Sequence, residues 1–65
     1  MNAAKNEYVS ACVRAVRAVW AESRRQGWNL DGQMAAESAV ARKANEHYDA
    51  ATLAGRPLRA PESYA

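Results

Sequence analysis

Residues 8–20, YVSACVRAVRAVW, contain the only long run of bulky apolar side chains in the chain. Successive residues of a helix are about 100° apart, so the apolar members of this run share one arc of roughly 140°. Those members are Tyr8, Val9, Cys12, Val13, Val16, Val19 and Trp20. In a strand the same side chains would be divided between two opposite faces. The period therefore predicts an amphipathic helix.

Residues on both sides of this stretch predict where the first helix begins and ends. The side-chain amide oxygen of either Asn2 or Asn6 can accept hydrogen bonds from the free N–H groups of a first helical turn. Gly27 is the residue type that most often ends a helix, because glycine adopts the left-handed conformation without strain. We expect the first helix to cover about residues 3–26.

A short polar connection should lead into a second helix. The hinge is predicted at residues 27–31, with Asp31 as the cap of the next helix and Leu30 folded down as a hydrophobic staple. The second helix should cover about residues 32–54 and end at Gly55. So short a connection makes the two helices antiparallel neighbours.

The inward face of the second helix differs from that of the first because most of its side chains are small. Its expected core members are Met34, Val40, Ala41, Ala44 and Tyr48. Small residues let two helix backbones approach closely, and the larger side chains of the first helix fill the space above them. The sequence thus predicts an all-α fold, an antiparallel two-helix hairpin.

The size of the chain favours association. A domain of 65 residues buries only about 60% of its unfolded surface, and usually needs a disulfide, a metal or an oligomer. One cysteine and one histidine form neither an internal disulfide nor a complete zinc site. Tyr8, Cys12 and Val19 are expected on the side that the second helix need not cover. We therefore expect two hairpins to pair into a four-helix bundle homodimer, with a different protein as the alternative partner.

The sequence offers few residues that could be catalytic. Cys12 lies inside the apolar stripe, which is typical of a buried and unreactive thiol. His47 is at the edge of the second stripe, where a surface histidine is more common than a catalytic base. No glycine-rich phosphate loop or local nucleophile motif is present. We expect no enzymatic activity, no cofactor, no metal and no small-molecule substrate.

The sequence also indicates a cellular location and the character of the C-terminal segment. No apolar run approaches the roughly 20 residues that span a membrane, and the opening MNAAKNEYVS lacks the order of a secretion signal. We expect a cytoplasmic protein that does not enter the membrane. The final segment, residues 55–65, is predicted to be extended or disordered. Its composition favours a frayed terminus, and the alternative is that Leu58 and Tyr64 anchor it.

Charge is distributed unequally between the two halves. Residues 1–30 hold five basic and two acidic side chains, a balance of +3, and residues 31–54 hold two basic and four acidic ones, a balance of −2. Glu37 projects within the apolar arc of the second helix, and antiparallel pairing brings it near Arg17 or Arg24. We expect an ion pair that fixes the helix register, in preference to an acidic contact for a partner.

The first helix also carries a basic ridge beside its apolar stripe, with Arg14, Arg17, Arg24 and Arg25 as its members. Such a ridge usually keeps a protein in solution, but it can also bind phosphates or an acidic protein surface. Trp28 in the hinge either packs over the end of the bundle or anchors a partner, as tryptophan often does. Together with Glu37, these are the candidate partner-binding residues.

In format, over about residues 3–54, the chain resembles small plasmid-encoded RNA-binding dimers that regulate replication priming. It also resembles small phage-encoded proteins that bind and disable host regulators. The resemblance is one of architecture and assigns no functional residue. We expect a small non-catalytic protein-interaction module, a regulator or inhibitor that binds a host protein. The alternative is a dimeric nucleic-acid-binding regulator that uses the basic ridge.

Overall fold

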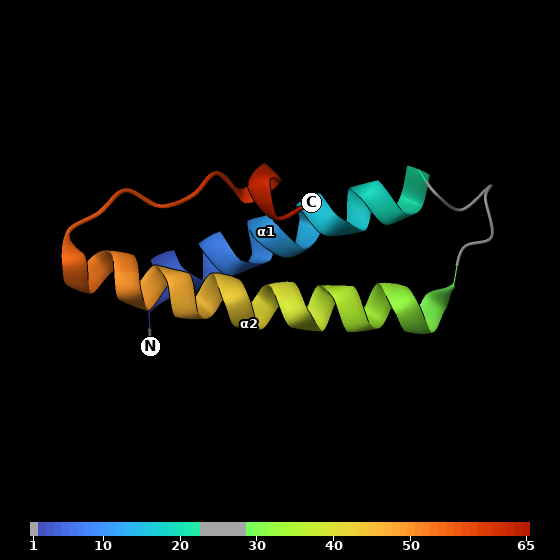
Figure 1. The fold of residues 1–65 in the computed structure, drawn as a ribbon, viewed down its shortest axis with the longest axis horizontal. Coiled ribbons are helices and arrows are strands. Elements are labelled where there is room, and N and C mark those ends of the chain that lie inside the picture. Colours follow the sequence, from blue (N-terminus) through green and yellow to red (C-terminus); the bar gives the residue numbers. More distant parts are fainter. Residues whose placement is uncertain (1, 23–28) are drawn as a thin grey trace.

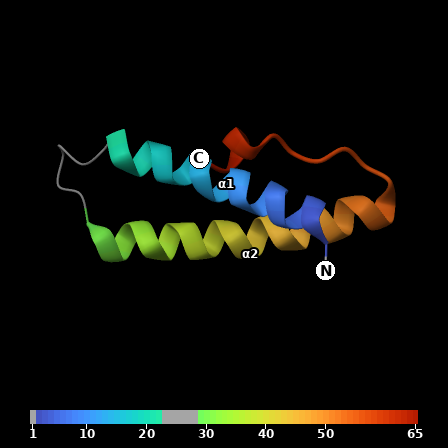
Figure 2. The same cartoon turned by 180° about the vertical axis from the view of Figure 1, so that it is seen from behind.

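Two long helices and a short C-terminal turn make up the protein, as a computed structural model shows for residues 2–22 and 29–65. The elements are α1 (Ala3–Glu22), α2 (Leu30–Ala54) and the 3-10 helix η2 (Pro61–Tyr64). The described part of the chain contains no strand. α1 and α2 are antiparallel, and the chain after α2 turns back over α1 (Figure 1, and from behind in Figure 2). The predicted all-α hairpin is confirmed.

α1 begins where the sequence predicts. The side-chain oxygen of Asn2 accepts a hydrogen bond from the Lys5 N–H over 3.1 Å, and its backbone oxygen accepts one from the Asn6 N–H. Asn2 is therefore the cap, rather than Asn6. The predicted last turn of this helix, with Arg24 and Arg25, lies outside the described residues, as does Trp28.

α2 begins two residues earlier than predicted, and its cap is Asn29 rather than Asp31. Asn29 has an extended backbone, and its side-chain oxygen accepts a hydrogen bond from the Gly32 N–H over 3.1 Å. Asparagine caps helices as well as aspartate does, and Asp31 gains a favourable place in the first turn. Leu30 is 52% exposed, so the predicted hydrophobic staple is wrong.

The end of α2 confirms the prediction for Gly55. Its backbone is left-handed, with φ at 66°, and its N–H donates to the carbonyl oxygens of Ala51 and Thr52. The Arg56 N–H donates to the Ala51 carbonyl oxygen over 2.9 Å. A residue other than glycine would be strained in this conformation. α2 therefore ends with the carbonyl groups of Ala51 and Thr52 hydrogen-bonded to the residues that follow the helix, and the chain can reverse.

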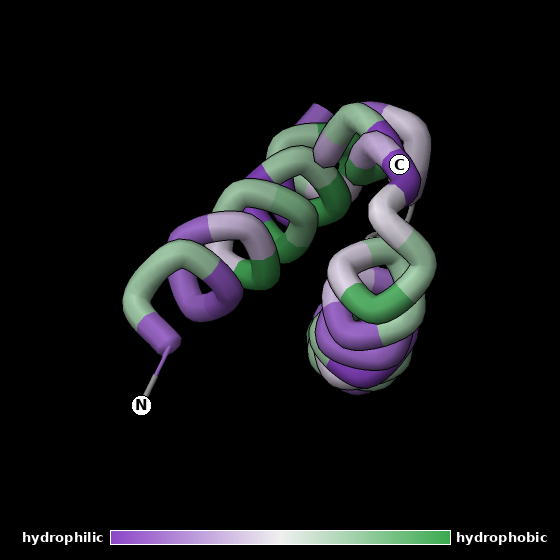
Figure 3. Tube along the Cα trace, turned by 90° about the vertical axis from the view of Figure 1, so that its left-hand side faces the viewer, coloured by the Kyte–Doolittle hydropathy of each residue, from purple (hydrophilic) through white to green (hydrophobic). Residues whose placement is uncertain are grey.

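The core lies between the two helices, with large side chains of α1 against smaller ones of α2. Its buried members are Tyr8, Cys12, Val16, Val40 and Ala44, and Val9, Trp20, Ala36, Tyr48 and Tyr64 pack around them. Figure 3 shows the most hydrophobic segments of α1 on its side toward α2. Among other expected members, Val13 and Ala41 are partly buried. Met34 is 59% exposed and so lies outside the core of the chain, and Val19, expected on the side that the second helix need not cover, is 48% exposed.

The C-terminal segment forms a third layer, so the expectation of a frayed terminus is wrong. After an extended stretch, η2 packs on α1. The Tyr64 ring meets the Tyr8 ring edge-on at 6.5 Å between centroids, whereas Leu58 remains 41% exposed. Tyr8 and Cys12 were expected outside the reach of the second helix, yet they are central core residues. The difference arises because η2 covers them from the other side.

Candidate protein-interaction surface

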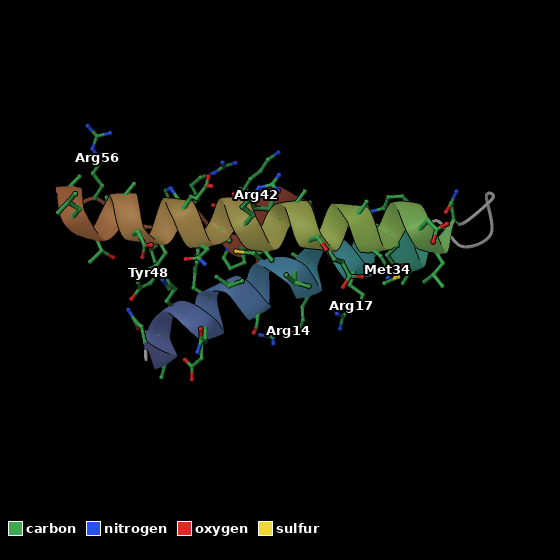
Figure 4. The ribbon with its side chains drawn as sticks, turned by 90° about the horizontal axis from the view of Figure 1, so that it is seen from below. Arg14, Arg17, Met34, Arg42, Tyr48 and Arg56 are labelled. Carbon is green, nitrogen blue, oxygen red and sulfur yellow. The ribbon has the colours of Figure 1, made fainter. Side chains whose placement is uncertain are left out.

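One side of the α1–α2 layer is covered by the C-terminal segment, and the other is left uncovered by the residues that the structure describes. We call the uncovered side the open face. Its members are Lys5, Val9, Val13 and Arg17 of α1 and Met34, Glu37, Ala41, Tyr48 and Asp49 of α2. Figure 4 views the molecule from below, with Arg14, Arg17, Met34 and Tyr48 in view and the C-terminal segment behind the helices. Arg42 and Arg56 project from the opposite edge of α2.

An ion pair joins the two helices at one end of the open face. Nη2 of Arg17 is 2.7 Å from Oε1 of Glu37, and Nε of the same guanidinium donates to that oxygen over 3.3 Å. The other carboxylate oxygen accepts a hydrogen bond from Nε2 of Gln33 over 2.8 Å. These hydrogen bonds, first that from Arg17 and then that from Gln33, hold the pKa of Glu37 below its usual value. The predicted inter-helix ion pair is confirmed.

A second ion pair joins the helices at the other end, and sequence reasoning missed it. Nζ of Lys5 is 3.2 Å from Oδ1 of Asp49. The register of the helices could have identified the pair, because moving from Arg17 to Lys5 on α1 matches moving from Glu37 to Asp49 on α2, twelve residues in each case.

Apolar side chains occupy the space between the two ion pairs. Val9, Val13, Ala41 and Tyr48 are there, each partly buried by the hairpin itself. Beyond the Arg17–Glu37 pair, toward the connection, exposure rises: Met34 is 59% exposed, and Leu30, one turn before it on α2, is 52% exposed. The open face is thus an apolar strip with charged ends, the composition that protein partners usually cover.

Of the four arginines in the basic ridge, the structure describes Arg14 and Arg17. Arg14 is exposed on α1, where it lines two shallow hollows together with Ser10. Arg17, the next member, is bound to Glu37, and this contact also raises the pKa of its guanidinium. Arg24 and Arg25 fall outside the described residues. Within the part of α1 that the structure describes, both arginines of the ridge are exposed, and one of them, Arg17, is also paired with Glu37.

Cys12 and His47, the two candidates for catalysis, both make contacts that stabilise the fold. The Cys12 side chain is fully buried, and burial raises the pKa of its thiol, which disfavours the reactive thiolate. Nε2 of His47 accepts a hydrogen bond from the Arg59 N–H over 3.0 Å, and the imidazole lies 6.3 Å from the Tyr8 ring. His47 therefore holds the C-terminal segment in place.

The described residues give no sign of a metal site or of a membrane span. In residues 2–22 and 29–65, no three His, Cys, Asp or Glu side chains are grouped so that they could hold a metal ion. Neither α1 nor α2, as described, is long and apolar enough to cross a bilayer. No protein-family model matches the sequence, and neither does any curated protein or solved structure. A proposal for function must therefore start from the open face.

Proposed function

We propose that this chain is a small non-catalytic protein-interaction module of the cytoplasm, which regulates or inhibits a protein by binding it through the open face. The observation that supports the proposal most directly is the uneven covering of the hairpin. The C-terminal segment shelters Tyr8 and Cys12, yet Val13 remains only partly buried and Met34 is 59% exposed on the other side. Burial of such apolar surface is the main source of affinity between proteins.

The charges of the open face favour a protein over a nucleic acid. Its two cations, Lys5 and Arg17, are each paired with a carboxylate, Asp49 and Glu37. Binding to a phosphate backbone depends on cations that can replace its counterions, and paired cations are poorly suited to that. A surface with both signs of charge at its ends and apolar side chains between them complements another protein surface.

The partner in this proposal is either a second copy of the chain or a different protein. A second copy would complete a four-helix bundle, because two hairpins with one uncovered face each can bury both faces against each other. A different protein would have to offer an apolar groove or helix of similar length. In both cases the same side chains are buried, so one set of variants tests the proposal.

A comparison of two lysine substitutions tests the proposed function. Met34→Lys places a charge on the open face, and Leu53→Lys is the matched control on α2, since Leu53 is 92% exposed. The chain and both variants would serve as bait in a lysate treated with nuclease, after circular dichroism has shown equal helix content. We expect a protein species that the chain and Leu53→Lys retain and Met34→Lys loses.

Two results would contradict the proposed function. Affinity for mixed DNA or RNA that falls steeply with salt, is lost on Arg14→Ala and is unaffected by Met34→Lys would contradict the proposal. It would favour the nucleic-acid-binding dimer instead. Retention of the same species by all three baits would show that the open face is not the binding surface.

A further inference from the structure

The two edges of the open face have opposite charge. Lys5 and Arg17 stand along the α1 edge, and their partners Asp49 and Glu37 stand along the α2 edge. Asp49 keeps 64% of its side chain exposed and Arg17 keeps 57%. One side chain of each ion pair therefore remains accessible and can contact a charged side chain of a partner.

A second copy can meet this face in two symmetric ways, because a two-fold axis must lie in the plane of contact. If the axis runs across the helices, α1 lies over α1 of the partner, and Lys5 comes near the partner's Arg17. If the axis runs along the helices, α1 lies over the partner's α2, and Lys5 comes near the partner's Asp49. The first arrangement brings like charges together at both ends, and the second forms a ring of four alternating charges at each end.

The open face is long enough for such a contact. The molecule is 41 Å long, and the two ion pairs that mark the face lie twelve residues apart on each helix, roughly 18 Å. The apolar side chains on it include Val13, Met34 and Tyr48. Exposed ion pairs contribute little free energy, so burial of these side chains supplies the affinity and the charges select the orientation.

We infer that a second copy of this chain binds to the open face with the two-fold axis parallel to the helices. The result is an antiparallel four-helix bundle in which both C-terminal segments lie on the outside. This inference rests on the proposed function and names the partner for the same surface. It also requires Met34 of one copy to lie at the same end of the bundle as the partner's Met34, with the axis between them.

Single-cysteine crosslinking tests this arrangement. The native thiol is first removed by Cys12→Ala, and each new cysteine is then placed at an exposed position. With a short thiol-to-thiol crosslinker, Met34→Cys should give a covalent dimer. Leu53→Cys, on the outer side of α2, should not. An axis across the helices would instead bring Met34 close to the partner's Thr52, so a mixture of Met34→Cys and Thr52→Cys reports that alternative.

The possible outcomes distinguish a failure of the inferred dimer from a failure of the proposed function. A mass of two chains in sedimentation, together with Met34→Cys dimers, supports the inference. A preferred Met34–Thr52 crosslink, or crosslinking through Leu53→Cys, overturns the orientation. A mass of one chain at high micromolar concentration overturns the second copy as the partner. That last result leaves the proposed function standing if Met34→Lys still loses a protein that Leu53→Lys retains.

Discussion

The phenol of Tyr8 donates a hydrogen bond to the carbonyl oxygen of Arg59, 2.8 Å away, although 51 positions separate the two residues. The N–H group of Arg59 donates to Nε2 of His47 on the other long helix, over 3.0 Å. Side chains from α1 and α2 thus hold both backbone polar groups of one residue. This double attachment, with Tyr64 packed behind it, makes the C-terminal segment part of the fold.

Tyr8→Phe should loosen that attachment and keep the ring in place. The lost hydrogen bond is part-buried, so we expect the free energy of unfolding to fall by about 0.5–1.5 kcal/mol. Urea unfolding measures this change, and faster hydrogen exchange at the Arg59 amide locates it. Tyr64→Phe is the control, because its hydroxyl is 3.5 Å from that of Tyr8 and should matter less. Equal stability and exchange in Tyr8→Phe would show that the bond contributes nothing.

Removal of residues 56–65 should uncover the Cys12 thiol. In the whole chain this side chain is fully buried, and burial raises its pKa, so a thiol reagent should label it slowly at neutral pH. The shortened chain lacks η2 over α1, and we expect labelling many times faster while helix content remains. Labelling in denaturant gives the upper limit. Equally slow labelling in both chains would mean that α2 alone shelters the thiol.

Local signals predicted the helices and one of their contacts correctly. The period of residues 8–20 identified α1, and Gly55 identified the end of α2. Antiparallel register was enough to bring Glu37 to Arg17. These predictions succeed because helix period, helix ends and register depend on residues that are close in sequence or fixed by a short connection.

Two features could not be predicted from the sequence: the hydrogen bonds of particular backbone atoms, and the separation of the two helices. Composition does not show that the backbone of Arg59 will find two side-chain partners, so the last segment was expected to fray. A helical wheel gives the direction of Met34 but not the distance to the facing helix. α1 stands apart from α2 near the connection (Figures 1 and 2), and the Met34 side chain remains 59% exposed.

Trp20 and Gly32 make a close contact near the connection that can be tested. A Cβ atom at Gly32 would lie 3.0 Å from Cη2 of the Trp20 indole, tighter than most carbon contacts, so the ring would have to shift slightly. Gly32→Val should displace the indole and shift its fluorescence to longer wavelength. The measurement is made in a Trp28→Phe background, which leaves one tryptophan. Gly32→Ala should change stability less, since its gain in helix propensity of about 0.5–1 kcal/mol offsets a small displacement. An unchanged spectrum in Gly32→Val would contradict the contact.

Ala44 lies in the core between the two helices. It is fully buried in the core cluster with Cys12 and Val16. Ala44→Leu should overpack this site and lower the free energy of unfolding by about 1–3 kcal/mol. Ala50→Leu is the matched control on the same helix, because Ala50 is exposed and surface changes usually stay within about 0.5 kcal/mol. Similar urea midpoints for the two variants would mean that the core tolerates the larger side chain at position 44.

The Arg17–Glu37 pair should make the fold sensitive to acid. Hydrogen bonds from Arg17 and then Gln33 lower the pKa of Glu37 in the folded chain, so the folded state binds this proton less readily than the unfolded state does. The stabilisation is present above the unfolded carboxyl pKa, about 4.3, and is lost as pH falls through the lower folded value. Glu37→Gln should therefore be less stable than the chain at neutral pH and lose less stability on acidification.

Unfolding in urea across this pH range measures both effects of Glu37→Gln. Glu46→Gln, at an exposed position of the same helix, controls for the loss of one negative charge. Because Arg17 is 57% exposed, added salt should also screen the pair and reduce the difference between Glu37→Gln and the chain at neutral pH. If Glu37→Gln and the chain lose stability in parallel as acid is added, the carboxylate of Glu37 is not the group on which the acid acts.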